Sequence, residues 1–247
     1  MRLGLVIFSL VFFFNFARAD LAGVKAGVGT WNYDVSGSVR YQGTDADIEN
    51  GFRISDNNEA FFWLAIEHPV PGLPNLKLMH TRLSTDGSGT VNSSFTFGNS
   101  TYNVGNDVTS ELTLNQTDVI LYYELLDTQV HFDLGLNFKV FDGTAKVRST
   151  AAGANEQVDF TGVLPMVYAS LSVKLPFTGL SVGVEGSTAS YSGNTLSDVM
   201  AKVSYVTKAK VGFEVGYRRM NLKLDDLDSF NSDITIDGPF AAVKFEF

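Results

Sequence analysis

The chain has 247 residues, and its 27 Asp and Glu outnumber its 18 Lys and Arg to give a formal net charge of −9. This acidity argues against nucleic acid as a partner, because nucleic-acid binding relies on basic side chains that neutralise phosphates. The sequence contains no cysteine, which excludes disulfides, thiolate zinc sites and a thiol nucleophile.

The first 19 residues have the pattern of a secretory signal peptide. Arg2 precedes an apolar run over residues 3–14, and Ala17 and Ala19 form a small-residue cleavage site. The run is too short to cross a bilayer as a helix, which needs about 20 residues; a buried core helix is the alternative. We predict removal of residues 1–19, export through the Sec pathway and a single domain over residues 20–247.

The first half of the remaining chain predicts four strands with alternating apolar side chains. They lie over residues 21–33, 59–67, from 75 onward, and 109–126. Both faces of residues 59–67 are apolar, so the pattern leaves the orientation of that strand open. Three prolines within residues 68–74 predict a turn, because proline cannot donate to a ladder. Within the polar stretch 85–108, Phe95 and Phe97 alternate with polar residues and predict a hairpin.

Residues 130–141 form the clearest strand in the sequence. One face is apolar at six successive positions, namely Val130, Phe132, Leu134, Leu136, Phe138 and Val140. The other face is mostly polar, and this alternation favours a strand over a helix. Five further strands are predicted over residues 163–175, 180–187, 199–205, 211–218 and 234–247.

The last of these strands ends in an aromatic residue. Ala241, Val243, Phe245 and Phe247 share one face, and charged residues lie on the other. A terminal strand of this kind resembles the closing strand of bacterial outer-membrane β-barrels, which is recognised by the barrel-assembly machinery. The resemblance implies that these four residues form an assembly signal.

The connections between strands alternate between long and short. The long ones are residues 34–57, 85–108, 150–157, 190–197 and 225–233, and the short ones are 68–74, 127–128, 176–179 and 208–209. Tight periplasmic turns and long extracellular loops are typical of outer-membrane barrels. In architecture the chain resembles the small porin-like barrels of Gram-negative bacteria, of the OmpA and OmpW type. The resemblance implies an all-β, antiparallel up-and-down transmembrane β-barrel of ten strands, with eight as the alternative.

The inward faces of the predicted barrel carry six charges of each sign. They are Lys25, Lys139, Lys174, Lys202, Arg218 and Lys244, with Glu67, Glu124, Asp133, Glu185, Glu214 and Glu246. Ten strands enclose a plugged or narrow lumen, since wide aqueous channels need about sixteen. We therefore expect a network of ion pairs that stabilises the lumen. A selectivity filter is the alternative, although a filter would favour one sign.

The histidine positions argue against an enzyme. His68, His80 and His131 all fall near predicted turns, in the inner half of the barrel, so no general base is expected at the outer rim. The acidic loops at residues 45–50 and 225–233 offer oxygen ligands for calcium but lack the spacing of an EF-hand. We expect no catalytic residues, no metal site and no cofactor.

Fold alone does not determine function. The first hypothesis is a non-enzymatic barrel with a structural or surface role; a narrow channel for small solutes and an outer-membrane hydrolase are the alternatives. The expected partners are outer-membrane lipid and lipopolysaccharide, with periplasmic chaperones and the assembly machinery during biogenesis. A soluble periplasmic β-protein is the alternative fold.

Overall fold

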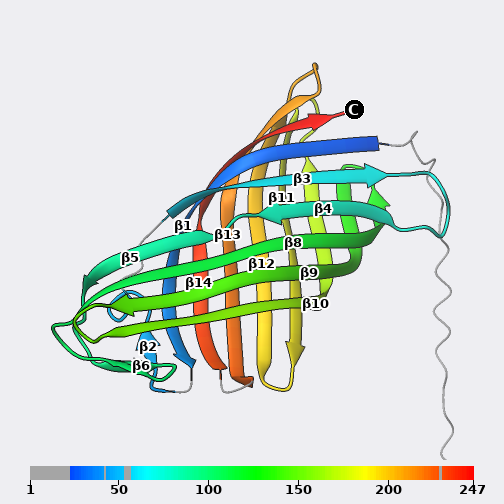
Figure 1. Ribbon diagram of the computed structural model, residues 1–247. Coiled ribbons are helices and arrows are strands. Elements are labelled where there is room, and N and C mark those ends of the chain that lie inside the picture. The colour runs from blue at the N-terminus through cyan, green and yellow to red at the C-terminus, as the bar shows by residue number, and fades with distance from the viewer. Residues whose placement is uncertain (1–22, 42, 53–56, 228–229) are drawn as a thin grey trace, which may run out of the picture.

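The computed structural model describes residues 23–41, 43–52, 57–227 and 230–247. In these residues the chain is all β, and ten strand positions close into an antiparallel up-and-down barrel, as predicted (Figure 1). The described part contains no helix that is long and apolar enough to cross a membrane. The predicted leader, with Ala17 and Ala19, lies outside the described residues.

The strands follow one another around the wall in sequence order. They are β1 (Gly23–Tyr41), β3 (Asn57–Glu67), β4 (Asn75–Thr81) continued by β5 (Ser84–Thr90), β8 (Asp107–Asp127), β9 (Val130–Ser149), β10 (Ala154–Lys174), β11 (Leu180–Tyr191), β12 (Asn194–Val206), β13 (Val211–Leu227) and β14 (Phe230–Glu246). Pairing of β14 with β1, from Lys25↔Glu246 to Tyr41↔Phe230, closes the barrel.

Alternation along the strands sorts side chains between the outer surface and the lumen. On β9, the outward Leu136 is 50% exposed, whereas the inward Lys139 is 1% exposed. The structure also decides the orientation of β3, which the sequence leaves open. Phe61 points inward and is 2% exposed, and its neighbour Phe62 points outward and is 56% exposed.

The two ends of the barrel differ in their connections. The end that carries the C-terminus, here called the turn end, has the connections at 68–74, 128–129, 175–179 and 207–210; the opposite end is the loop end. At the loop end only two connections are long. One contains β2 (Ala46–Asp47), and the other contains the hairpin of β6 (Phe95–Phe97) and β7 (Ser100–Tyr102), which the aromatic alternation predicts.

Three of the loops expected from the sequence are largely paired strand. Residues 154–157, 190–191 and 194–197 extend β10, β11 and β12, and residues 225–227 and 230–233 extend β13 and β14. Gly153 and Gly193 have φ values of 60° and 87°. Glycine adopts this left-handed conformation without steric cost, so tight turns join the hairpins and the strands continue past the predicted loop boundaries.

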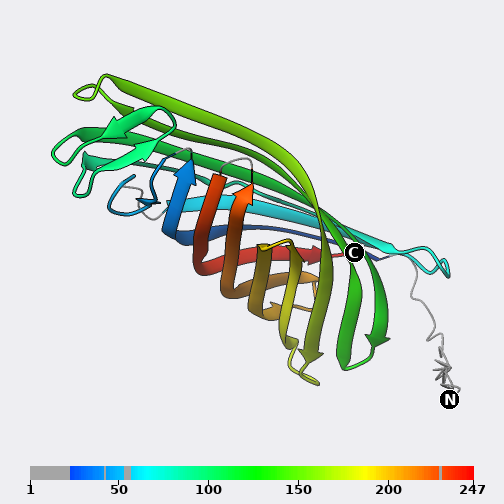
Figure 2. The ribbon, with the colours of Figure 1, turned by 90° about the horizontal axis from the view of Figure 1, so that it is seen from below.

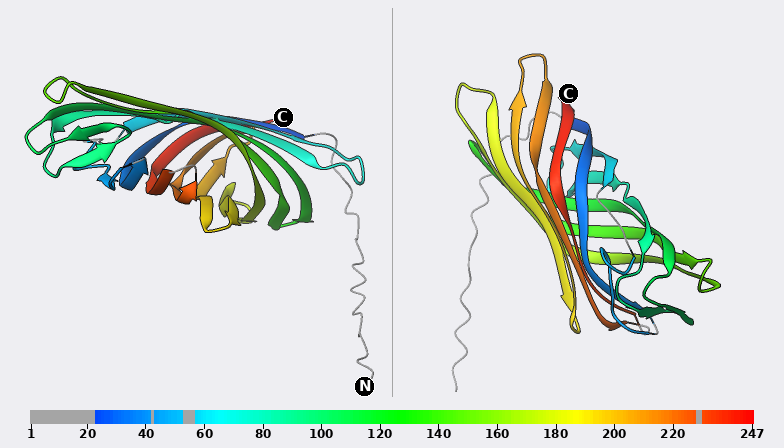
Figure 3. Two further views of the ribbon diagram at one scale, coloured as in Figure 1. Left: turned by 60° about the horizontal axis from the view of Figure 1, so that its bottom comes forward. Right: turned by 90° about the vertical axis from the view of Figure 1, so that its left-hand side faces the viewer.

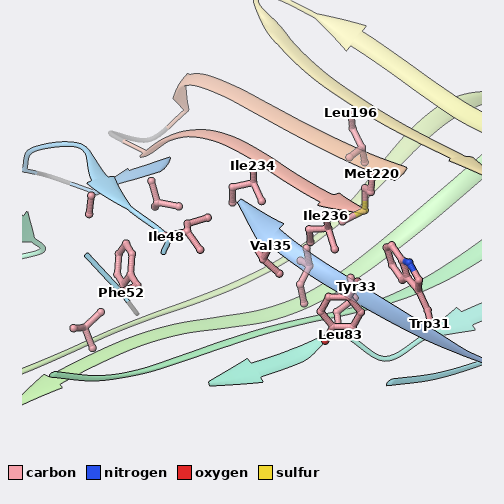
Figure 4. Packing of buried hydrophobic residues seen from close by; sticks show 14 of the residues in the cluster. Trp31, Tyr33, Val35, Ile48, Phe52, Leu83, Leu196, Met220, Ile234 and Ile236 are labelled. Carbon is pink, nitrogen blue, oxygen red and sulfur yellow. The ribbon is translucent and has the colours of Figure 1, made fainter. Parts of the chain in front are cut away.

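At the loop end the barrel flattens into two layers. β8, β9 and β10 cross over β11 to β14 at a steep angle (Figures 1 and 2) and lie as a separate layer in Figure 3. A cluster of buried apolar side chains fills the space between the layers, with Val35 from β1, Leu196 from β12, Ile234 from β14 and Leu83 from the link between β4 and β5 (Figure 4). The loop end therefore has a packed core.

The alternation on β9 gives a direct test of inside and outside. We expect Leu136→Arg to prevent stable insertion, because a cation facing lipid near mid-height costs about 2–4 kcal/mol. Folding into lipid vesicles, followed by the mobility shift of unheated protein in electrophoresis, measures this effect. Leu136→Ala keeps an apolar surface and should insert. Normal insertion of Leu136→Arg would show that the two faces of β9 are assigned the wrong way round.

Candidate functional site: the charged lumen

Most of the predicted inward charges lie in three groups along the lumen. The group nearest the middle, here called the Glu185 network, joins six side chains from β4, β11, β12, β13 and β14. They are Lys77, Glu185, Lys202, Glu214, Lys244 and Glu246. Lys77 Nζ lies 2.7 Å from Glu185, and Lys202 Nζ lies 3.3 Å from Glu185 and 3.8 Å from Glu214. Three cations balance three anions.

The second group, here called the Asp198 network, lies closer to the loop end. It consists of Asp118, Lys139, Asp198 and Arg218. Lys139 Nζ is 2.8 Å from Asp118 and 2.9 Å from Asp198, and the Arg218 guanidinium donates to both carboxylate oxygens of Asp198 at 2.9 and 2.7 Å. The Arg218 guanidinium also lies over the Trp31 ring, 4.6 Å from its centroid. Two cations balance two anions in a buried site.

The third group lies at the turn end and is acidic. Lys25 Nζ pairs with Glu67 at 2.7 Å, and the Tyr122 hydroxyl donates to the same carboxylate at 3.1 Å. Glu124 accepts a hydrogen bond from Asn75 at 3.4 Å. Asp133 forms no ion pair with any described residue. This end of the lumen therefore has fewer cations than anions.

The sequence-predicted set differs from the observed networks in four residues. Lys174 is exposed at the turn end and makes no ion pair within the described part of the chain. Three network members were not predicted, namely Lys77, Asp118 and Asp198. Alternation identifies each as inward, since Lys77 lies between the outward Leu76 and Leu78, and Asp198 precedes Met200 by two residues. The sequence lacked the register that sets Asp118 opposite Lys139 on the neighbouring strand, and the cross-lumen distances that bring Lys77 to Glu185 and Asp198 to Lys139.

Apolar side chains, here called the plug, pack in the lumen around the Asp198 network. Trp31, Phe61, Met166, Met220 and Phe240 are all buried and belong to one cluster. The Phe61 and Phe240 rings meet edge to face from opposite sides of β1, 5.8 Å apart. The sequence did not predict this plug. An inward apolar side chain interrupts the alternation of its strand only locally.

The β6–β7 hairpin covers the loop end and joins the same apolar cluster. Phe95 and Phe97 pack against Phe52 from the first long connection, with ring centroids 5.4 Å apart in each case. The Tyr102 hydroxyl donates to the carbonyl of Val147 on β9 at 3.0 Å. The hairpin is therefore fixed to β9 and to the first long connection.

The three histidines are occupied by local contacts. His68 lies in the turn after β3 and bonds to Pro74 O at 3.0 Å, and His80 bonds to the Thr117 hydroxyl at 2.9 Å. His131 Nδ1 lies 2.7 Å from Asp127. Among the described residues, none of them hydrogen-bonds to a serine hydroxyl, although Ser172 lies opposite His131 in the β9–β10 ladder. Within that part of the chain, no group of three or more His, Asp or Glu is placed to hold a metal ion.

Solved structures with the same fold exist, although the sequence matches no family model and no curated protein. The outer-membrane protease OmpT from Escherichia coli superimposes with a TM-score of 0.55 at 10% identity, over 91% of this chain and 97% of that one. The chain has the fold of an outer-membrane β-barrel. Two further barrels give lower TM-scores. The NalP translocator domain from Neisseria meningitidis gives 0.42 at 10% identity, covering 91% and 88% of the two chains, and Ail from Yersinia pestis gives 0.38 at 9%, covering 92% and 100%.

The outer surface of this outer-membrane barrel fits a bilayer. Large apolar side chains are exposed on the outward face of strand after strand, including Leu134, Val167, Val184, Val203 and Val215. Monomeric soluble proteins rarely expose so continuous an apolar surface. The four residues of the predicted assembly signal, Ala241, Val243, Phe245 and Phe247, belong to this outward face of the chain's end, where the rings of Phe245 and Phe247 stack.

The Asp198 network predicts a large effect of removing one charge. We expect Lys139→Ala to fold but to lose about 3–5 kcal/mol of stability, because Asp118 and Asp198 are left buried without their shared cation. Equilibrium unfolding in urea from lipid vesicles, followed by tryptophan fluorescence, measures the loss. Lys208→Ala in an exposed turn should leave the free energy of unfolding unchanged. Equal stability of the two variants would contradict a buried ion-pair network.

The fixed hairpin predicts a change in alkaline stability. Burial, with a smaller contribution from the nearby Glu156 carboxylate, raises the pKa of Tyr102 to about 12. The folded state thus favours the neutral phenol, so the stabilisation by this group is complete below the unfolded pKa of about 10 and is lost as the pH rises toward 12. We expect Tyr102→Phe to lower the free energy of unfolding by about 1 kcal/mol at pH 8. Above pH 10, the free energy of unfolding should fall less steeply with pH in this variant than in the parent protein. Parallel pH profiles for both proteins would refute this role.

Proposed function

We propose that this outer-membrane barrel is a closed, non-enzymatic protein that holds a rigid two-layered extension at the cell surface. The observation that carries the proposal is the filled lumen. Two balanced charge networks and an apolar plug fill the lumen, and the β6–β7 hairpin covers the loop end. A barrel filled in this way serves as a scaffold for what lies at its loop end.

A narrow channel is the alternative, and the packing of the lumen argues against it. Lys139 and Arg218 are each 1% exposed and hold their carboxylate partners at hydrogen-bond distance. An ion passing this level would have to break buried pairs, which costs several kcal/mol for each charge left unpaired. Ten strands enclose little more than the volume of their own side chains.

A hydrolase is the other alternative, and the position of the histidines argues against it. His68, His80 and His131 all lie in the half of the barrel toward the turn end. A general base must reach the proton that it abstracts within about 3 Å. Within the lumen, a substrate from the cell surface would meet the plug and the hairpin before reaching His131, whereas His80 points outward beside Phe62.

The proposed biogenesis follows from the two ends of the chain. The leader would direct export through the Sec pathway, and periplasmic chaperones would deliver the unfolded chain. The outward aromatic face of the last strand, with Phe245 and Phe247, would then be bound by the barrel-assembly machinery. Lipid and lipopolysaccharide would cover the apolar band of the inserted barrel.

Single-channel conductance in a planar bilayer tests the closed lumen. We expect folded protein, whose insertion is verified by the electrophoretic mobility shift, to give no steady openings. As a control, Trp31→Gly with Phe240→Gly shortens two plug side chains and should raise the frequency of brief openings. Steady wild-type openings whose ion selectivity reverses in Lys202→Glu would instead establish the channel.

A further inference from the structure

The barrel wall parts between β10 and β11 toward the loop end. β10 pairs with β9 along its whole length, from Ala154↔Ser149 to Val173↔Val130. Its pairing with β11 runs only from Lys174↔Ser181 to Val167↔Thr188. Between Val167 and the loop end, no described strand pairs with β10 on the side that faces β11. Figures 1 and 3 show β10 turning away from β11.

The backbone groups on this free edge can be identified from the ladder. Lys174 N donates to Gln129 O and Leu175 N to Leu180 O, each at 2.8 Å. Since hydrogen-bond direction alternates along a strand, even-numbered residues of β10 bond to β9 and odd-numbered residues face the β11 side. The residues that present N–H and C=O groups to the free edge are Asn155, Gln157, Asp159, Thr161 and Val163, with Pro165 presenting only C=O.

Pro165 explains where the pairing stops. In the register of the β10–β11 ladder, Pro165 would face Ser190 and would have to donate a hydrogen bond to it. Proline has no N–H, so the ladder loses a bond at the first residue beyond Val167 whose backbone groups face β11. The separation of β11 from β10 thus has a cause in the sequence.

The two faces of the free edge differ in polarity. On the inner face, Val158, Phe160 and Leu164 are partly buried against the apolar cluster, and the position beside Gly162 is open space. On the outer face, the Asp159 carboxylate accepts hydrogen bonds from Thr144 and Gln157. A strand added here would complete the cover over the apolar face and would keep polar side chains outward.

We propose that the free edge of β10 binds an extended segment of another polypeptide at the cell surface by β-strand addition. The inference rests on the proposed surface role. Only an extended backbone offers acceptors and donors at the spacing of residues 155–165, a stretch of about 35 Å that suits roughly ten residues. The bound segment is apolar at every second residue, toward Phe160, and uncharged or basic opposite Asp159.

A second copy of the chain is a poorer occupant. Two copies inserted in the same direction and joined edge to edge are related by a rotation about the membrane normal. This rotation sets the polar outer face of one β10 strand beside the apolar inner face of the other. β5, which pairs with β8 at the loop end, is the other strand to consider, and it has Thr85, Gly87 and Gly89 on its inner face. These side chains give an apolar segment almost nothing to pack against.

Hydrogen exchange of the full barrel in nanodiscs, measured by NMR at each amide, tests the proposal. The probe is a synthetic peptide of alternating Val and Thr with a Lys at each end. We expect it to slow exchange at Gln157, Asp159, Thr161 and Val163 by at least about tenfold, and to leave Val158 and Phe160 unchanged, since β9 already protects them. Unchanged exchange at the odd-numbered amides with millimolar peptide would overturn the proposal.

Two matched controls separate strand addition from adsorption to the surface. Thr161→Pro removes a donor from the free edge without touching the β9 ladder and should weaken peptide binding at least about tenfold, whereas Thr161→Ala keeps the donor and should bind as the parent does. Gln157→Pro repeats the test if Thr161→Pro fails to insert. A peptide N-methylated at alternate residues should give no protection, and equal protection by it would refute strand addition. The conductance measurement tests the closed lumen independently of peptide binding. A barrel that neither conducts nor binds peptide would therefore contradict the edge site and remain consistent with the proposed closed scaffold.

Discussion

The closure of β14 against β1 is the constraint on which the rest of this structure depends. In a bilayer every backbone N–H and C=O group needs a partner within the protein, so a sheet can cross only if it has no edge there. The ladder from Lys25↔Glu246 to Tyr41↔Phe230 supplies that closure between the two ends of the sequence. Once the sheet is closed, alternation leaves each side chain either in lipid or in the lumen, and the chemistry of the lumen follows from this choice.

The lumen of so small a barrel has room for side chains and for little else. Charged residues that alternation places there are removed from water and must find partners across the axis. Glu185 on β11 is bound by Lys77 from β4 and by Lys202 from β12, and Asp198 on β12 is bound by Lys139 from β9 and Arg218 from β13. The Lys77–Glu185 and Lys139–Asp198 pairs cross the lumen, whereas the other two join neighbouring strands. The crossing pairs therefore specify which strands face one another, and all four fill the space.

The loop end does not need a closed sheet, because it lies toward water. β8, β9 and β10 continue well past the point where β11 turns back, and the tube becomes two layers around an apolar core that includes Tyr33, Leu83 and Ile236 (Figure 4). A strand edge is tolerated here because water or another chain can satisfy its backbone groups. Proline and charged residues on an edge strand oppose non-specific pairing with other chains. Pro165 and Asp159 have this effect on β10, and a partner that pairs there must be compatible with both residues.

The sequence by itself indicated the ten strands, the inward and outward faces of every one of them except β3, and the closing strand, since these depend on alternation that is local to each segment. It also indicated the β6–β7 hairpin through Phe95 and Phe97. Only the tertiary structure decided that Phe61 rather than Phe62 points inward, that Lys77, Asp118 and Asp198 complete the networks, and that β10 separates from β11. Each of these depends on the distance or register between strands far apart in the chain, and a periodic pattern within one strand carries no information about its partner across the lumen.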